Sequence, residues 1–207
     1  MGRIAEWKKE IGYHKHLIVA SLLFLVIAIF FDVVAGTYVT KVGGVTAPDL
    51  ILDNIPTIDL DFLFVWGGVL MVTVLFLYPL FFRVKEVHKV ISQFSLLIMV
   101  RAAFTCFTHL ATPSDALLFE VPSLVSFFTF QNDLFFSGHT AVAFLGFLIF
   151  KEKKIRYFFL GLSILMGITV LLMHVHYSID VLSAFFIAYG TFKIGEWFFS
   201  KINYYNH

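Results

Sequence analysis

One uncharged run limits the folds that are open to this chain. From Phe62 to Phe82 the sequence has 21 consecutive residues without a charged side chain. As an α-helix, such a run is long enough to cross about 30 Å of hydrocarbon. A soluble domain of 207 residues would need a far more polar surface than this chain offers, because 59% of it is hydrophobic and only 14% is charged. The sequence therefore predicts an integral membrane protein rather than a soluble helical domain.

Further apolar segments complete the predicted architecture, an all-α integral membrane bundle formed by one domain over residues 1–207. Its six expected transmembrane helices lie at about residues 17–36, 62–82, 90–111, 134–150, 157–173 and 181–199. The segment Ala116–Phe130 is also apolar, but Glu120 and Pro122 divide it, and we expect an interfacial hairpin or half-helix there. The N-terminus lacks a cleavage-site pattern, so we expect it to be retained rather than removed as a signal peptide.

Charged residues alternate between the two sets of loops. Thirteen of the fifteen Lys and Arg residues fall on one side of a six-span arrangement, and the two others are Lys41 and Arg101. Seven acids lie in the alternate loops, namely Asp49, Asp53, Asp59, Asp61, Asp115, Glu120 and Asp133. Because basic loops stay in the cytoplasm, we expect cytoplasmic N- and C-termini and extracytoplasmic acidic loops. A net charge of +1 carries no signature of nucleic-acid binding, and no such partner is expected.

The first polar cluster, QNDLFFSGHT, stands at the entry to the fourth expected span. Ser137 is a candidate N-cap, and Gly138 allows another group to approach the backbone closely. The free N–H groups of a helix start bind anions well, and His139 would add a proton donor there. The alternative is that His139 is an interfacial polar residue that caps the helix and does no chemistry.

The second cluster, MHVHYSID, precedes the last expected span on the same side of the membrane. His176 and Asp180 are four residues apart, which places them one turn from each other on one helix face. An aspartate beside an imidazole fixes its tautomer and raises its basicity, as a nucleophilic or basic histidine requires. His174 cannot share that face in a regular helix. The alternative is a His–Asp hydrogen bond that only stabilises the helix mouth.

Arg101 lies about halfway through the third expected span, where an unpaired cation is costly. It is either a structural partner of Asp32 or another interhelical acid, or an anion anchor reached from the extracytoplasmic side. Two histidines, an orienting aspartate, an arginine and a helix N-terminus together suit phosphoryl transfer through a phosphohistidine. Charge on the phosphoryl oxygens needs cations and N–H donors, and the leaving alcohol needs a proton.

These motifs resemble a known family. SGH, with Asp133 four residues before Ser137, and the downstream HYSIDV resemble the type 2 phosphatidic acid phosphatase superfamily and specifically its sphingomyelin synthase branch. Weaker similarities are APDLILDNIP in the first acidic loop, RAAFTCFT in the third span, and Ala184, Tyr189 and Thr191 in the last span. The phosphatases of the superfamily usually carry Lys-x6-Arg-Pro and Ser-Arg elements, and neither occurs in this chain. Their absence favours the synthase branch.

The resemblance implies a reaction and roles for the residues. His176, oriented by Asp180, would attack a lipid phosphodiester, and His139 would protonate the departing diacylglycerol oxygen and then activate the incoming hydroxyl. Asp133 would orient His139, while Arg101, Ser137 and Gly138 would bind the phosphate. The implied donor is a glycerophospholipid and the implied acceptor is a ceramide or diacylglycerol-like alcohol. The resemblance implies no cofactor and no metal.

Three hypotheses follow from the sequence. The first is this transfer of a phospho-headgroup between lipids. The second is a lipid phosphatase or pyrophosphatase that uses the same residues with water as the acceptor. The third is a metal-binding or transport protein without catalytic activity, with His139, His174, His176 and Asp180 as ligands. The only cysteine, Cys106, excludes an intrachain disulfide and a Cys-based metal cluster.

Overall fold

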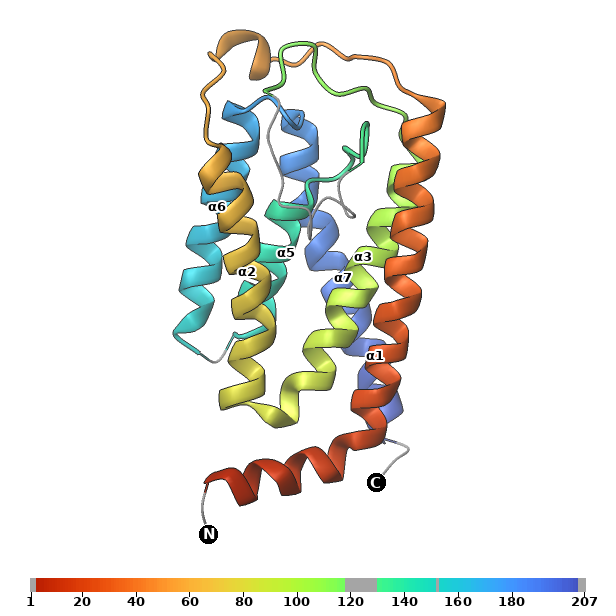
Figure 1. Cartoon of the computed structure of the whole chain (residues 1–207), viewed down its shortest axis with the longest axis vertical. Coiled ribbons are helices and arrows are strands. Elements are labelled where there is room, and N and C mark those ends of the chain that lie inside the picture. Colours follow the sequence, from red (N-terminus) through yellow and green to blue (C-terminus); the bar gives the residue numbers. More distant parts are fainter. Residues whose placement is uncertain (1–2, 118–129, 152, 205–207) are drawn as a thin grey trace.

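The computed structural model describes residues 3–117, 130–151 and 153–204. Within these ranges the regular structure is helical, apart from one isolated bridge between Val45 and Leu110. The helices are α1 (Arg3–Val42), α2 (Asp61–Phe82), α3 (Val87–Phe107), α5 (Gly138–Ile149), α6 (Ile155–Leu172) and α7 (Ser178–Tyr204), with short 3₁₀ helices at Leu52–Asn54 and Val84–Glu86. Figure 1 shows them as one upright bundle, with the beginning of α1 turned across its lower end.

Five of these helices are long and apolar enough to cross a membrane, and α5 is a shorter apolar helix. The prediction of an all-α bundle compatible with a multi-pass membrane protein is therefore confirmed. Twelve residues in α5 span about 18 Å, which is less than the hydrocarbon thickness. The hairpin or half-helix expected within Ala116–Phe130 falls mostly outside the described residues.

The start of α5 differs from the expected span, which was placed at 134–150. The helix begins only at Gly138, because Ser137 has an extended ψ of 111° and its hydroxyl accepts a hydrogen bond from the Thr140 N–H. Residues 130–137 are therefore an irregular segment that enters the bundle before the helix starts. Within it Leu134 and Phe136 are buried, so the segment is part of the core.

Two connections cover the upper end of the bundle in Figure 1. Residues 43–60 join α1 to α2, and residues 108–117 follow α3. They are linked by hydrogen bonds from the Val45 N–H to the His109 carbonyl and from the Ala111 N–H to the Val45 carbonyl, each 3.1 Å long. This pairing ends α3 four residues before the expected boundary at 111. We call this side the acidic end, because Asp49, Asp53, Asp59 and Asp115 lie in these connections.

Large apolar side chains cover much of the outside of the bundle. Phe62 on α2, Phe30 on α1 and Phe186 on α7 are among many exposed large hydrophobic residues. A soluble monomer rarely exposes so extensive an apolar surface, whereas hydrocarbon covers it without cost. Inside, α5 packs against α6 and α7, with Phe150 and Phe159 fully buried.

The orientation of the bundle remains a prediction that labelling can test. In a Cys106→Ala background, we expect single cysteines at Lys41 or Ser114 to react with a membrane-impermeant maleimide in intact cells, because both positions are exposed at the acidic end. Cysteines at Lys85 or Lys154, at the opposite end, should react only after the membrane is permeabilised. The reverse pattern would place the acidic end in the cytoplasm.

Candidate functional site

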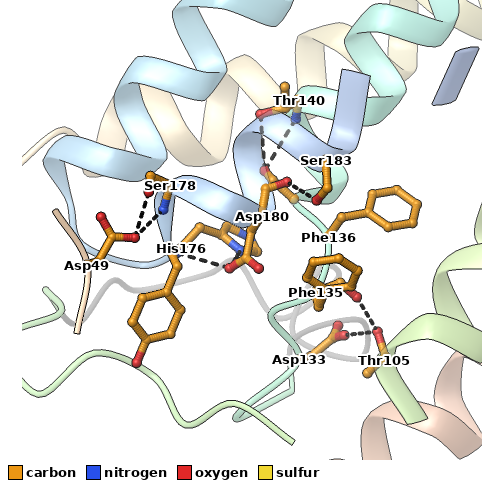
Figure 2. Close-up of polar contacts among 12 residues, drawn as sticks. Asp49, Thr105, Asp133, Phe135, Phe136, Thr140, His176, Ser178, Asp180 and Ser183 are labelled. Atoms are coloured by element: carbon orange, nitrogen blue, oxygen red, sulfur yellow. Dashed lines mark hydrogen bonds and ion pairs between the residues drawn. The ribbon is translucent and has the colours of Figure 1, made fainter. Parts of the chain in front are cut away.

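The two polar motifs meet where α5 and α7 begin. The Ser137 N–H donates to the Asp180 carbonyl at 3.2 Å, and the Ser183 hydroxyl donates to the same carbonyl at 3.3 Å. Ser137 and Asp180 are both fully buried. Residues that are more than forty positions apart in the sequence thus form one structural unit, which Figure 2 shows from close by. The structure thus brings the SGH and HYSID motifs into contact.

His176 lies against Asp180 in this unit. Its Nδ1 is 3.3 Å from Oδ2 of Asp180, and the same oxygen accepts a hydrogen bond of 3.0 Å from the Tyr177 N–H (Figure 2). Both side chains are buried, with His176 7% exposed and Asp180 0%. An Nδ1–H that donates to the carboxylate leaves Nε2 as the basic, nucleophilic nitrogen.

Arg101 on α3 is the main support of the irregular segment. Its Nε donates to the Phe136 carbonyl at 3.1 Å, and its Nη2 donates to the Asp133 carbonyl at 3.1 Å. Its Nη1 is 2.8 Å from Oδ2 of Asp133 and 3.7 Å from Oδ1 of Asp32. Backbone without helical hydrogen bonds is tolerated at membrane depth only where the protein supplies its partners, and Arg101 supplies several. The ion pair with Asp32, which the sequence offered as the structural alternative, is therefore formed, and Arg101 also contacts Asp133.

Thr105, one turn after Arg101 on α3, completes this support. Its hydroxyl contacts Oδ1 of Asp133 at 3.1 Å and the Phe135 carbonyl at 3.0 Å (Figure 2). Both carboxylate oxygens of Asp133 are therefore engaged by α3. The expected orientation of His139 by Asp133 has no supporting contact in the described part of the chain. Thr105 was not among the predicted site residues, although its spacing of four from Arg101 in RAAFT places both residues on one helix face.

His139 occupies the first turn of α5 and points towards α2. Its ring lies 4.3 Å from the Phe64 ring, between centroids, and hydrogen-bonds to the Phe64 backbone. It is close enough to His176 and Arg101 for a positive charge on either side chain to act on its ring. Gly68 leaves the space for the ring, because a Cβ at that position would lie 2.7 Å from Nε2 of His139. Gly138 leaves space for Arg101 in the same way, at 3.3 Å from Nε.

The space at Gly68 gives a test of the position of His139. Since real Cβ atoms do not approach neighbours this closely, Gly68→Ala should displace the imidazole and lower kcat by about 10-fold to 10³-fold, short of the full loss of an acid–base group. Gly161→Ala on α6 is the matched control, because its Cβ would meet no atom within 4 Å. Equal turnover in the two variants would show that the position of His139 does not matter.

Asp49 holds the start of α7 from the connection 43–60. Its Oδ2 accepts hydrogen bonds of 2.7 Å from the Ser178 N–H and 2.8 Å from the Ser178 hydroxyl, as Figure 2 shows. Burial raises the pKa of this carboxyl, but the hydrogen bonds from Ser178, Ile51 and Leu52 outweigh it and bring the pKa below 3.8. Asp49 therefore stabilises the site at neutral pH and loses this effect only in strong acid. The sequence pointed to it only through APDLILDNIP.

His174 forms a second His–Asp pair that is separate from the first. Its Nδ1 is 2.7 Å from Oδ2 of Asp115, while its backbone has a φ of 54°. The two histidines of MHVHYSID thus have different carboxylate partners. The described residues contain no group of three or more His, Cys, Asp or Glu side chains placed to hold a metal ion.

Comparison with known proteins gives a family match over part of the chain. A family model described as PAP2 superfamily C-terminal matches residues 132–197, a segment that contains both SGH and HYSIDV. No curated protein and no solved structure matches the chain significantly. The family match supports the type 2 phosphatidic acid phosphatase superfamily, and with it phosphatase or phosphotransferase activity on lipids. It does not distinguish the sphingomyelin synthase branch from the rest.

Proposed function

We propose that this protein is a lipid phosphotransferase that moves a phospho-headgroup from a glycerophospholipid to a lipid alcohol through a phosphohistidine. The observation that carries the proposal is the contact between the two motifs. The Ser137 N–H binds the Asp180 carbonyl, while the Asp180 carboxylate lies against His176. A candidate nucleophile with its orienting acid is thereby joined to the start of α5, whose N–H groups favour an anion.

In the proposed first step, Nε2 of His176 attacks the phosphorus of a phosphodiester and the bond to the diacylglycerol oxygen breaks. His139 gives this oxygen a proton, so that diacylglycerol leaves as a neutral alcohol. In the second step, the acceptor hydroxyl attacks the phosphohistidine, His139 takes its proton, and the bond from phosphorus to Nε2 breaks. Asp180 stabilises the positive charge on the His176 ring in both steps.

The charges around Arg101 favour transfer over hydrolysis of monoesters. Arg101 is the one Lys or Arg that contacts the irregular segment in the described part of the chain, and Asp133 and Asp32 already face it. A phosphate monoester carries up to two negative charges, so its binding here would be opposed by both carboxylates. A phosphodiester carries one. Transfer of a headgroup from a diester to an alcohol never requires a dianion to bind.

The test is a transfer assay with purified protein in mixed micelles. Labelled phosphatidylcholine or phosphatidylethanolamine is supplied with and without ceramide or diacylglycerol. We expect the label to move to the lipid acceptor, with release of the soluble headgroup as a minor reaction and no inhibition by EDTA. The control is the Asp180→Asn variant, which should not transfer the labelled headgroup because His176 loses its charged partner.

The same assay contains the outcome that would favour hydrolysis. Phosphatidic acid is offered to the protein under identical conditions, and inorganic phosphate is measured. Efficient release of phosphate, together with no transfer to any lipid acceptor, would replace the proposal by a lipid phosphate phosphatase that uses the same residues.

A further inference from the structure

Helix α1 brings a carboxylate into the bundle that the proposed reaction does not use. Oδ1 of Asp32 is 3.7 Å from Nη1 of Arg101, while Oδ2 of Asp133 is 2.8 Å from the same nitrogen. The three side chains are only 14%, 12% and 11% exposed, in the order Asp32, Arg101 and Asp133. Two carboxylates thus share one guanidinium where little water can screen them.

The charges in this cluster do not balance. Asp133 alone neutralises Arg101, and its second oxygen is hydrogen-bonded to Thr105. Asp32 is then a surplus anion, and in the described part of the chain Arg101 and Asp133 are the charged groups that act on it. Asp180 on α7 adds further negative charge near Arg101. A buried charge without its own partner is costly, so this cluster is poorly prepared for another anion.

A phosphate that binds at Arg101 must compete with Asp32. The other contacts of the guanidinium, to Asp133 and the Phe136 carbonyl, are between 2.8 and 3.1 Å and hold the irregular segment in place. The contact with Asp32 is the longest that Arg101 makes among the described residues. If Asp32 stayed ionised beside a bound phosphate, one guanidinium would face three anions.

Asp32 cannot simply turn away with its helix, because the face of α1 that carries it is fixed. One turn further along, a Cβ at Gly36 would overlap the Phe130 ring. Two turns further along, the Thr40 hydroxyl contacts the Gln131 carbonyl at 3.1 Å. The helix is therefore held against the same segment that Arg101 supports. Loss of the charge would remove the competition without any movement of the helix.

We propose that Asp32 takes up one proton when a phosphate monoanion binds at Arg101, so that substrate binding and proton uptake are coupled. The inference rests on the proposed function, because it takes Arg101 as the phosphate anchor. The proton comes from the solvent and is released again when the anion leaves. Neutral Asp32 no longer competes for Nη1, which frees an N–H for the phosphate. Asp32 acts through Arg101 and is a positioning residue.

The coupling has a fixed sign. At a pH low enough for Asp32 of the free protein to be protonated already, phosphate binds without proton uptake and its affinity does not depend on pH. At higher pH each bound phosphate brings one proton with it, and the affinity falls by up to about tenfold for each pH unit. Asp32→Asn should remove this dependence and keep the affinity at pH 8 near the low-pH value of the wild type.

The experiment measures protons taken up for each anion bound. The probe is dihexyl phosphate, a diester that keeps one negative charge between about pH 5 and 8. Calorimetric titration of the purified protein in two buffers with different heats of ionisation gives the proton number. We expect about one proton in the wild type where the affinity falls with pH, and about zero in Asp32→Asn. Asp59→Asn is the matched control, because Asp59 is exposed on the connection 43–60 and should keep the coupling.

Proton uptake that persists in Asp32→Asn would overturn the inference, as would binding to the wild type with no proton uptake at any pH. Failure of the wild type to bind dihexyl phosphate would also overturn it. Anion binding to the wild type without proton uptake would overturn the inference even if Asp32→Asn does not fold. Lipid-to-lipid transfer without proton uptake would leave the proposed function intact and remove only this inference. Proton uptake without transfer would keep the coupling between Asp32 and the anion and remove the proposed transfer.

Discussion

His176→Ala abolishes turnover, with a loss of about 10⁴-fold or more, and leaves no covalent phosphorus on the protein. We expect this result because removal of a nucleophile eliminates the intermediate, whereas removal of an acid–base group only slows its formation. The contact of 3.3 Å between Nδ1 of His176 and Asp180 directs the other nitrogen to the phosphorus. The measurement is labelling with a substrate that carries ³²P in its headgroup, quenched with detergent at alkaline pH because the P–N bond is labile in acid, and followed by gel analysis at alkaline pH.

His139→Ala serves as the comparison in the same experiment. Turnover should fall by about 10²-fold to 10⁴-fold, the usual range for a lost general acid. Label should still accumulate when the leaving group is a nitrophenol, which needs no proton to depart. His174→Ala should retain labelling, because His174 pairs with Asp115 rather than with Asp180. Labelling that persists in His176→Ala and disappears in His174→Ala would exchange the two assignments.

Much of the bundle could be predicted because hydrocarbon imposes simple rules. A spanning helix needs about twenty apolar residues, so run length alone located α2 to within one residue. The start of α5 could not be located in this way, since Leu134, Phe135 and Phe136 are as apolar as the helix that follows. The helix begins at Gly138 because the Ser137 hydroxyl caps its first turn by accepting a hydrogen bond from the Thr140 N–H. Hydropathy does not measure such a local hydrogen bond.

The pairing of charges was harder to predict than their presence. Sequence spacing identified His176 and Asp180 as neighbours because both lie in one short segment. Asp133 was assigned to His139 on the strength of the family resemblance, yet its carboxylate contacts Arg101 and Thr105 from another helix. Contacts between helices depend on how the bundle packs, which a periodic pattern in a single chain does not specify.

Arg101→Lys should lower both the stability and the turnover of the protein. A lysine keeps the positive charge, but a single ammonium cannot reach the carbonyls of Phe136 and Asp133 and both carboxylates together. Each buried carbonyl that loses its donor costs about 1–3 kcal/mol, so the thermal midpoint in detergent should fall together with activity. Turnover should drop by about 10²-fold or more, because displacement of residues 130–137 moves Ser137 and the start of α5 away from Asp180.

Two further variants, Thr105→Val and Lys41→Gln, separate the effect of the contacts with residues 130–137 from the effect of positive charge. Thr105→Val keeps the volume and the charge of the site but removes the hydroxyl that contacts Asp133 and the Phe135 carbonyl. It should lower the midpoint and turnover in the same direction as Arg101→Lys, but by less. Lys41→Gln removes an exposed positive charge at the acidic end and should change neither quantity. Wild-type turnover in Arg101→Lys would mean that the charge alone is sufficient. In that case the forked contacts would not be what holds the irregular segment against Asp180.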